Sequence, residues 1–158
     1  MSNPKTWSVY LAGEVHTDWR EQIRQLSDAA GLPVVFTAPV TDHDASDAAG
    51  DGLGPAPSGN GTHQGASYWR DQVSAGVNAI RTRTLIADAD IVIVRFGEKY
   101  RQWNAAFDAG YACALGKPVI TLHSPTLTHP LKEVDAAACA VAQTPEQVAE
   151  VLRYVIAG

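Results

Sequence analysis

Five short apolar runs, each bounded by glycine, proline or aspartate, constrain the fold more than any other feature of this sequence. The run at 91–94 reads IVIV and is apolar on both faces. A strand of this kind is typical of a parallel sheet covered by helices on both sides, whereas half-exposed strands alternate apolar and polar residues. We therefore predict a buried parallel sheet of five strands, at 7–12, 33–38, 91–96, 118–123 and 138–142.

Helical patterns lie between these strands. The first opens on a box-like pair, Asp18 and Glu21, and the last has Thr144 as its N-cap and Pro145 at its first position. Strands that alternate with helices predict a three-layer α/β domain with right-handed crossovers. The predicted helices span 18–30, 67–87 and 103–115, with a last one starting at 145.

Composition indicates one ordinary globular domain. The chain has 158 residues, of which 46% are hydrophobic and 18% charged, so we expect a single domain over 1–158 with one core. Residues 50–65 hold six glycines and two prolines, and we predict an irregular loop at about 50–66. A loop of that length is either a lid or binding loop, or an insertion with no role.

Charge and cysteine content exclude several classes of protein. Twelve Lys and Arg against seventeen Asp and Glu give a net charge of -5, which disfavours duplex nucleic acid as a partner. Cys113 and Cys139 form no CxxC, and the early apolar run at 9–12 is too short for a signal peptide or membrane span. No P-loop, GxGxxG or GxSxG motif is present. We expect a cytoplasmic protein with no cofactor and no membrane partner.

Candidate functional residues follow from the sheet. Ligands of an open parallel sheet bind outside the carboxyl ends of its strands, so the residues after each strand are the candidates. The first four predicted strands select Gly13, Glu14, His16 and Thr17, then Pro39, Thr41, Asp42, His43, Asp44 and Asp47, then Gly97, Glu98, Tyr100, Arg101, Gln102 and Trp103, and finally Ser124. Asn104, one residue after Trp103, is a further candidate.

One of these groups has the composition of a metal site. Asp42, His43, Asp44 and Asp47 supply carboxylates and an imidazole within one loop, which suits a hard cation or zinc. The competing interpretation is an Asx turn with a helix N-cap in a solvated loop. A metal-dependent hydrolase centred on this loop is therefore one alternative function.

Several sequence strings carry a family resemblance. YLAG at 10–13, AD at 89–90, DAGYA at 108–112 and LGKP at 115–118 resemble the nucleoside 2-deoxyribosyltransferase superfamily. Within it, GEVHTDWRE at 13–21, PVTDHD at 39–44 and RFGEKYRQWNAAFD at 95–108 resemble the YtoQ family. The resemblance implies a Rossmann-like, flavodoxin-type sheet. It also implies attack of a carboxylate on the anomeric carbon of a nucleoside, through a glycosyl-enzyme intermediate.

The resemblance also assigns site residues. Asp108 occupies the place of the superfamily's nucleophilic Glu and is one methylene shorter, while Gln102 replaces an acidic residue six positions earlier that helps to hold the base. Tyr10 corresponds to a tyrosine that orients the nucleophile, and Asp90 to an acid that holds a substrate group. Superfamily sites are often completed by a neighbouring subunit, so the resemblance implies a homo-oligomer.

Reasoning from the residues alone adds a second carboxylate and leaves rival interpretations. Glu14 follows the first strand at the edge that leads to Asp108, so one acid would act as nucleophile and the other as acid or base. Against this, Asp108 would merely compensate a helix dipole, and Tyr10 and Asp90 would be structural. Trp103 would stack a base or anchor an interface.

Two questions of function stay open at this point. The expected activity is transfer or hydrolysis of an N-glycosidic bond, and the alternative from another class is a nucleotide-binding protein without turnover. The substrate is either a nucleoside or a nucleotide.

Overall fold

The structure is a computed structural model that describes residues 5–53 and 66–158. The chain divides into two compact units, one of Met1–Thr37 with Leu85–Gly158 and one of Ala38–Thr84. The first unit contains the whole sheet, and the second unit is the segment of the chain between the second and third strands. The single domain expected from composition stays a prediction. Most of the glycine-rich loop expected at about 50–66 lies outside the described residues.

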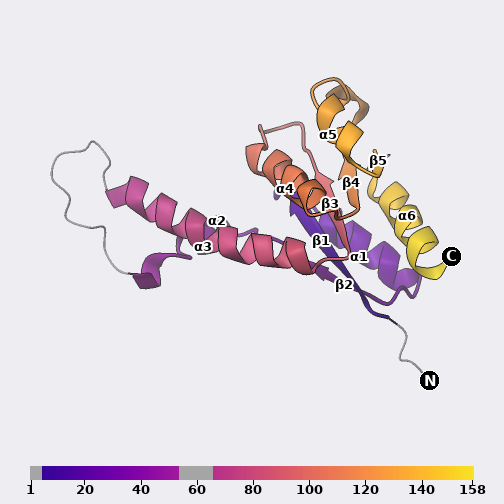
Figure 1. The fold of residues 1–158 in the computed structure, drawn as a ribbon, viewed down its shortest axis with the longest axis horizontal. Helices are drawn as coiled ribbons and strands as arrows, with labels where there is room; N and C mark the ends of the chain where they lie inside the picture. The colour runs from indigo at the N-terminus through magenta and orange to yellow at the C-terminus, as the bar shows by residue number, and fades with distance from the viewer. Residues whose placement is uncertain (1–4, 54–65) are drawn as a thin grey trace. The chain divides into compact units, whose positions relative to one another are not determined.

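The first unit contains a five-stranded parallel sheet, which confirms the predicted fold class (Figure 1). The strand order is β2-β1-β3-β4-β5, so the chain reverses its direction across the sheet between β1 and β3. A reversal of this kind opens a crevice at the carboxyl ends of the two strands, where α/β proteins bind their ligands. The strands are β1 (Trp7–Gly13), β2 (Val34–Thr37), β3 (Ile91–Arg95), β4 (Val119–Leu122) and β5 (Ala140–Ala142).

Four helices of the first unit cover the sheet. Helix α1 packs against α6, while α4 packs against β1, β3 and α5 (Figure 1). Thr144 caps α6 as predicted, because its Oγ1 accepts a hydrogen bond from the Gln147 N–H at 3.3 Å. The box-like pair predicted at the start of α1 is wrong, since the Asp18 carboxylate accepts from the Gln22 side chain at 2.7 Å and caps nothing. The helices are α1 (Trp19–Ala29), α4 (Trp103–Ala114), α5 (Lys132–Ala137) and α6 (Pro145–Ala157).

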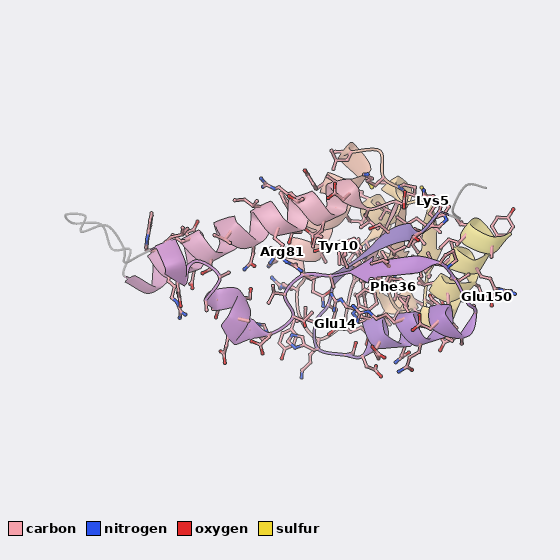
Figure 2. All side chains as sticks on the ribbon, turned by 90° about the horizontal axis from the view of Figure 1, so that it is seen from below. Lys5, Tyr10, Glu14, Phe36, Arg81 and Glu150 are labelled. Carbon is pink, nitrogen blue, oxygen red and sulfur yellow. The ribbon has the colours of Figure 1, made fainter. Side chains whose placement is uncertain are left out.

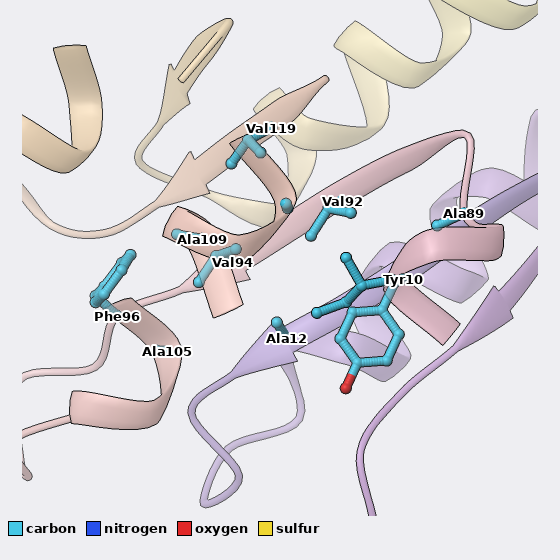
Figure 3. Packing of buried hydrophobic residues seen from close by; sticks show 11 residues of the cluster. Tyr10, Ala12, Ala89, Val92, Val94, Phe96, Ala105, Ala109 and Val119 are labelled. Carbon is cyan, nitrogen blue, oxygen red and sulfur yellow. The ribbon is translucent and has the colours of Figure 1, made fainter. Parts of the chain in front are cut away.

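A buried cluster joins α4 to the middle of the sheet (Figure 3). Alternate residues of β1 and β3 point to this face, including Tyr10, Ala12 and Val92, as the two-residue period of a strand requires. The helix contributes small side chains, which allow its backbone to approach the strands closely. They are Ala105, Ala109 and Ala112.

The second unit consists of short elements and most of one long helix. Its elements are α2 (His43–Asp47), the 3-10 turn η1 (Asp51–Leu53) and the first part of α3 (Ala66–Asp88). Asp51 and Arg70 form two parallel hydrogen bonds of 2.8 and 2.9 Å. Within the described residues, no helix is both long enough and apolar enough to cross a membrane.

Candidate functional site

The backbones of β1 and β3 approach each other closely at their carboxyl ends, where Gly13 pairs with Arg95. Gly13 has φ +101°, and a Cβ built there would lie 2.1 Å from the carbonyl oxygen of Arg95. The backbone N–H of the next residue, Glu14, donates to that same oxygen at 3.1 Å. Only glycine satisfies both the backbone angle and this approach. The side chain of Glu14 therefore begins at the point where the strand order reverses.

Two side chains of α1 fix the turn that carries Glu14. The buried Arg20 guanidinium donates to the carbonyls of Leu11 at 3.0 Å, Gly13 at 3.0 Å and Glu14 at 2.6 Å. The Trp19 indole N–H donates to the Glu14 carbonyl at 2.8 Å. Burial lowers the pKa of Arg20 to about 10, which leaves it charged near neutral pH. The turn is thus held by four hydrogen bonds from these two side chains and not by packing alone.

The Glu14 carboxylate is buried, with only 6% of the residue exposed, and is held by neighbouring donors. It accepts hydrogen bonds from the His16 N–H and from Thr17 Oγ1, the latter at 2.6 Å, and its Oε2 lies 3.4 Å from Arg95 Nε. Burial raises the pKa of Glu14, but the two hydrogen bonds and the Arg95 charge outweigh it and keep the pKa below its usual value. Glu14 is therefore ionised at neutral pH.

The loop after β3 closes over Glu14. A Cβ on Gly97 would lie 2.6 Å from Glu14 Cγ and 2.9 Å from Gln102 Nε2. The Gly97 N–H donates to Gln102 Oε1 at 2.9 Å, so the amide of Gln102 turns back from the start of α4 and presents Nε2 as a donor. The rings of His16 and Tyr100 are in contact in a tilted arrangement, with their centroids 4.6 Å apart. These contacts bring together Glu14 and Gln102, which were predicted after the first and third strands.

Asp108 lies on the inward side of α4. It is the sixth residue of the helix and shares a face with the buried Ala105 and Ala112. The interpretation of Asp108 as a dipole-compensating acid is wrong, because that effect is confined to the first turn, where α4 has no acidic residue. Burial raises the pKa of Asp108 to about 6. Within the described part of the chain, its carboxylate makes no hydrogen bond or ion pair.

Tyr10 lies on the face of the sheet that is covered by α4, the helix that carries Asp108. It is fully buried on β1 and packs in the cluster to which α4 contributes its alanines, at the side opposite Phe96 in Figure 3. The role of Tyr10 in orienting Asp108 stays a prediction.

Four predicted binding residues take no part in these contacts. Asp90 is at the amino end of β3, where it accepts from Lys5 Nζ at 2.7 Å and the Ser8 N–H at 2.9 Å. Figure 2 shows Lys5 and Glu14 at opposite ends of β1, so Asp90 does not join the carboxyl-edge residues. Asp44 is exposed on α2 in the second unit, and Trp103 and Asn104 are exposed at the start of α4.

The metal-site hypothesis for 42–47 is wrong for the residues that the structure describes. Asp42 is the N-cap of α2 and accepts from the Ala45 N–H at 2.8 Å, which was the competing interpretation. Across the described ranges, no group of three or more His, Cys, Asp or Glu side chains is arranged to hold a metal ion. The metal-dependent hydrolase alternative therefore loses its proposed centre.

Sequence reasoning assigned no role to several residues of this edge. Arg95 was missed because it closes an apolar strand, although a lone cation at that position is itself a signal. Glu98 was noted only by position, and its Oε1 accepts hydrogen bonds from Ser124 Oγ and from Thr126 Oγ1. Thr17 was noted only by its position after the first strand, because its importance depends on the turn around Glu14.

Comparisons with known sequences match nearly the whole chain. The family model described as nucleoside 2-deoxyribosyltransferase YtoQ matches residues 10–156. A Bacillus subtilis (strain 168) protein described as uncharacterized protein YtoQ is 41% identical over 147 residues, which cover 92% of this chain and 94% of the relative.

Solved structures show the likeness of the fold. A conserved protein from Enterococcus faecalis V583 matches with a TM-score of 0.58 at 13% identity, over 96% of this chain and 100% of that one. DNA processing protein A from Helicobacter pylori matches with a TM-score of 0.55 at 16% identity, over 96% of this chain and 82% of that one. The family match and the B. subtilis relative extend along nearly the whole sequence, and the chain therefore belongs to the nucleoside 2-deoxyribosyltransferase YtoQ family.

Proposed function

We propose that this protein is an enzyme that transfers or hydrolyses the N-glycosidic bond of a nucleoside or nucleotide. The observation that carries the proposal is that the first unit holds two carboxylates in opposite environments. Glu14 has a lowered pKa, whereas the pKa of Asp108 is raised to about 6. Paired acids with divergent pKa values are typical of enzymes that break glycosidic bonds. Membership of the YtoQ family supports nucleoside chemistry in general.

Asp108 is the proposed nucleophile. Its unpaired carboxylate attacks the anomeric carbon, the bond from that carbon to the base nitrogen breaks, and the base leaves with the bonding electron pair and takes up a proton. An acceptor base or a water molecule then attacks the same carbon, loses a proton, and releases the Asp108 carboxylate. A pKa of about 6 leaves most of the carboxylate ionised at neutral pH and makes it more basic than an ordinary aspartate.

Glu14 is the proposed electrostatic partner. Both of its oxygens are already bound, Oε1 by the His16 N–H and Oε2 by Thr17 and Arg95, so it is poorly placed to form a covalent bond. Its fixed negative charge instead stabilises the positive charge that develops on the sugar in an oxocarbenium-like transition state. The sequence suggested that this acid is the nucleophile or an acid or base; its bound oxygens support an electrostatic role instead.

The amide and aromatic residues around α4 would bind the base. Gln102 Nε2 is a donor directed at the same crevice, and Asn104 and the 72%-exposed Trp103 begin the helix that carries Asp108. We propose that the amides bind the base edge, that Trp103 stacks on it, and that Gly13 and His16 line the sugar side. Asp90 takes no part in this proposal, since it lies at the other end of β3.

The test is product analysis with a panel of 2′-deoxynucleosides and their 5′-monophosphates, each with and without a free acceptor base. We expect released or exchanged base from the natural sequence, and none above background from Asp108→Ala. Glu14→Ala should retain a small residual rate. If no compound turns over but one raises the melting temperature, the protein is a nucleotide-binding protein, and the glycosyl-transfer proposal fails.

We also propose that the protein acts as a homo-oligomer in the cytoplasm. The exposed side of α4 carries a large apolar side chain, Phe107 at 58% exposure, on the helix that holds Asp108. Aromatic side chains of this kind are enriched at subunit interfaces. Sedimentation analysis should give a mass above that of the monomer, and Phe107→Ser should lower it. A monomeric mass for the natural sequence would contradict this proposal.

A further inference from the structure

Glu98 is an exposed carboxylate that is nevertheless held in one place. Its Oε1 accepts hydrogen bonds from Ser124 Oγ and from Thr126 Oγ1, the latter at 2.9 Å, and these two hydroxyl oxygens are 2.6 Å apart. The hydroxyl groups lower the pKa of Glu98, so it is ionised at neutral pH. In the described residues, Glu98 Oε2 has no hydrogen-bond partner and can accept one from a ligand.

A buried network holds Ser124 behind Glu98. His123 lies fully within the protein, with its Nδ1 2.8 Å from the Ser124 carbonyl oxygen and its Nε2 2.9 Å from Asp135 Oδ2. Thr121 Oγ1 donates to the other oxygen of Asp135 at 2.8 Å. The end of β4 is therefore tied to α5, and the hydroxyl that positions Glu98 has a rigid support.

The cations near Glu98 each contact another residue. The Arg95 charge lowers the pKa of both Glu14 and Glu98, so one guanidinium balances two carboxylates. Lys99 Nζ lies 5.5 Å from the centre of the Tyr100 ring, and the Arg101 guanidinium lies 5.8 Å from that of Trp103. Among the described residues, neither Lys99 nor Arg101 forms an ion pair with Glu98, so its carboxylate charge is not neutralised by a direct partner.

From this arrangement we propose that Glu98 is a specificity-determining residue. It accepts a hydrogen bond from the 5′-hydroxyl of the sugar and rejects a substrate that carries a phosphate on that hydroxyl. The inference rests on the proposed function and answers a question that the function leaves open, since it selects nucleosides over nucleoside monophosphates. A phosphate monoester carries nearly two negative charges at neutral pH, and a fixed carboxylate within a few ångströms repels it. An unphosphorylated hydroxyl instead donates to Oε2.

The experiment compares kcat/KM for a 2′-deoxynucleoside with kcat/KM for its 5′-monophosphate. We expect the natural sequence to prefer the nucleoside by about tenfold or more, and Glu98→Gln to reduce this preference about tenfold by improving use of the monophosphate. Ser124→Ala should weaken the preference less, since it frees the carboxylate without removing its charge. Glu150→Gln is the matched control, because Glu150 is an exposed acid paired with Arg153 on α6.

Binding measurements on Asp108→Asn, with the same nucleoside and monophosphate, separate recognition from turnover. The nucleoside should bind more tightly than the monophosphate, and adding Glu98→Gln should narrow the difference. A natural preference for the monophosphate, or a preference that Glu98→Gln leaves within twofold, would overturn this inference while the glycosyl-transfer function stands. Failure of the natural sequence to turn over either compound would overturn the proposed function and the inference with it.

Discussion

The two ends of the sheet in the first unit both carry acidic residues close to a cation, but the surroundings of these acids differ. At the amino end, Asp90 is partly exposed, pairs with Lys5 at 2.7 Å and has a lowered pKa because of the hydrogen bonds from Lys5 and the Ser8 N–H. At the carboxyl end, Glu14 is buried against Arg95, and the pKa of Asp108 is raised by burial. The amino end therefore shows an ordinary surface pair, whereas the carboxyl end holds one acid stabilised by buried donors and another whose burial disfavours its ionised form.

From this difference we infer that residue type and position beside a strand do not identify a functional acid. A surface ion pair such as Lys5 with Asp90 contributes about 0–1 kcal/mol and needs no other explanation. A partly buried carboxylate without a partner costs stability, so it indicates a site where chemistry compensates for that cost. Substitutions at the two ends of the sheet test this difference between their acids.

Removing the acid at each end should have unequal effects on turnover. Asp108→Asn should lower kcat by about 1000-fold or more, since it removes the nucleophile while keeping the shape of the side chain. Asp90→Asn should change kcat less than about threefold, because it weakens only a surface pair. Initial rates with the best nucleoside of the panel provide the measurement. Equal losses in the two variants would contradict the contrast between the two ends.

Arg20→Met should lower the free energy of unfolding by about 3 kcal/mol, because three carbonyls of the Glu14 turn lose their donor in a buried site. Arg24→Met is the control on the same helix, since Arg24 only approaches Glu21 at 4.0 Å, and it should cost less than about 0.5 kcal/mol. Urea unfolding followed by tryptophan fluorescence measures both. A small effect of Arg20→Met would show that packing alone holds the turn.

Gly97→Ala should destabilise the protein by about 1–3 kcal/mol and lower the rate about tenfold, because the new methyl group displaces Glu14 and Gln102. Gly110→Ala is the matched control, because a Cβ there meets nothing within 4 Å and the residue lies within α4. It should stabilise the protein by about 0.5–1 kcal/mol. Thermal unfolding and initial rates measure the two effects, and an unchanged rate in Gly97→Ala would contradict the position assigned to Glu14.

The pH dependence of stability should reveal the environment of Asp108. Because its pKa rises from 3.8 to about 6 on folding, the folded protein binds more protons than the unfolded chain between these values. Stability therefore falls as pH rises through this window, and the full penalty, about 3 kcal/mol, is present above pH 6. Asp108→Asn should be more stable by about this amount at pH 7.5 and no more stable at pH 3.5. A constant difference in urea midpoints across that range would contradict the raised pKa.

The sequence predicts the sheet well because its signal is local. The apolar runs and the capping residues Thr144 and Pro145 mark elements that the structure confirms, and only short helices such as α2 and α5 lack enough residues to show a period. The site is harder to predict, because the pKa of Glu14 depends on Thr17 and Arg95, which the fold brings together from separate segments. Position after a strand identified Glu14, whereas family resemblance was needed to single out Asp108.

The central claim is that Asp108 forms a covalent bond to the sugar, and the most direct measurement is intact-protein mass spectrometry after rapid acid quenching of the enzyme with a 2′-deoxynucleoside. We predict a mass increase equal to one deoxyribosyl group, located by peptide mapping on Asp108 and absent from Asp108→Asn. Turnover of the nucleoside with no adduct, or an adduct that persists in Asp108→Asn, would contradict the account.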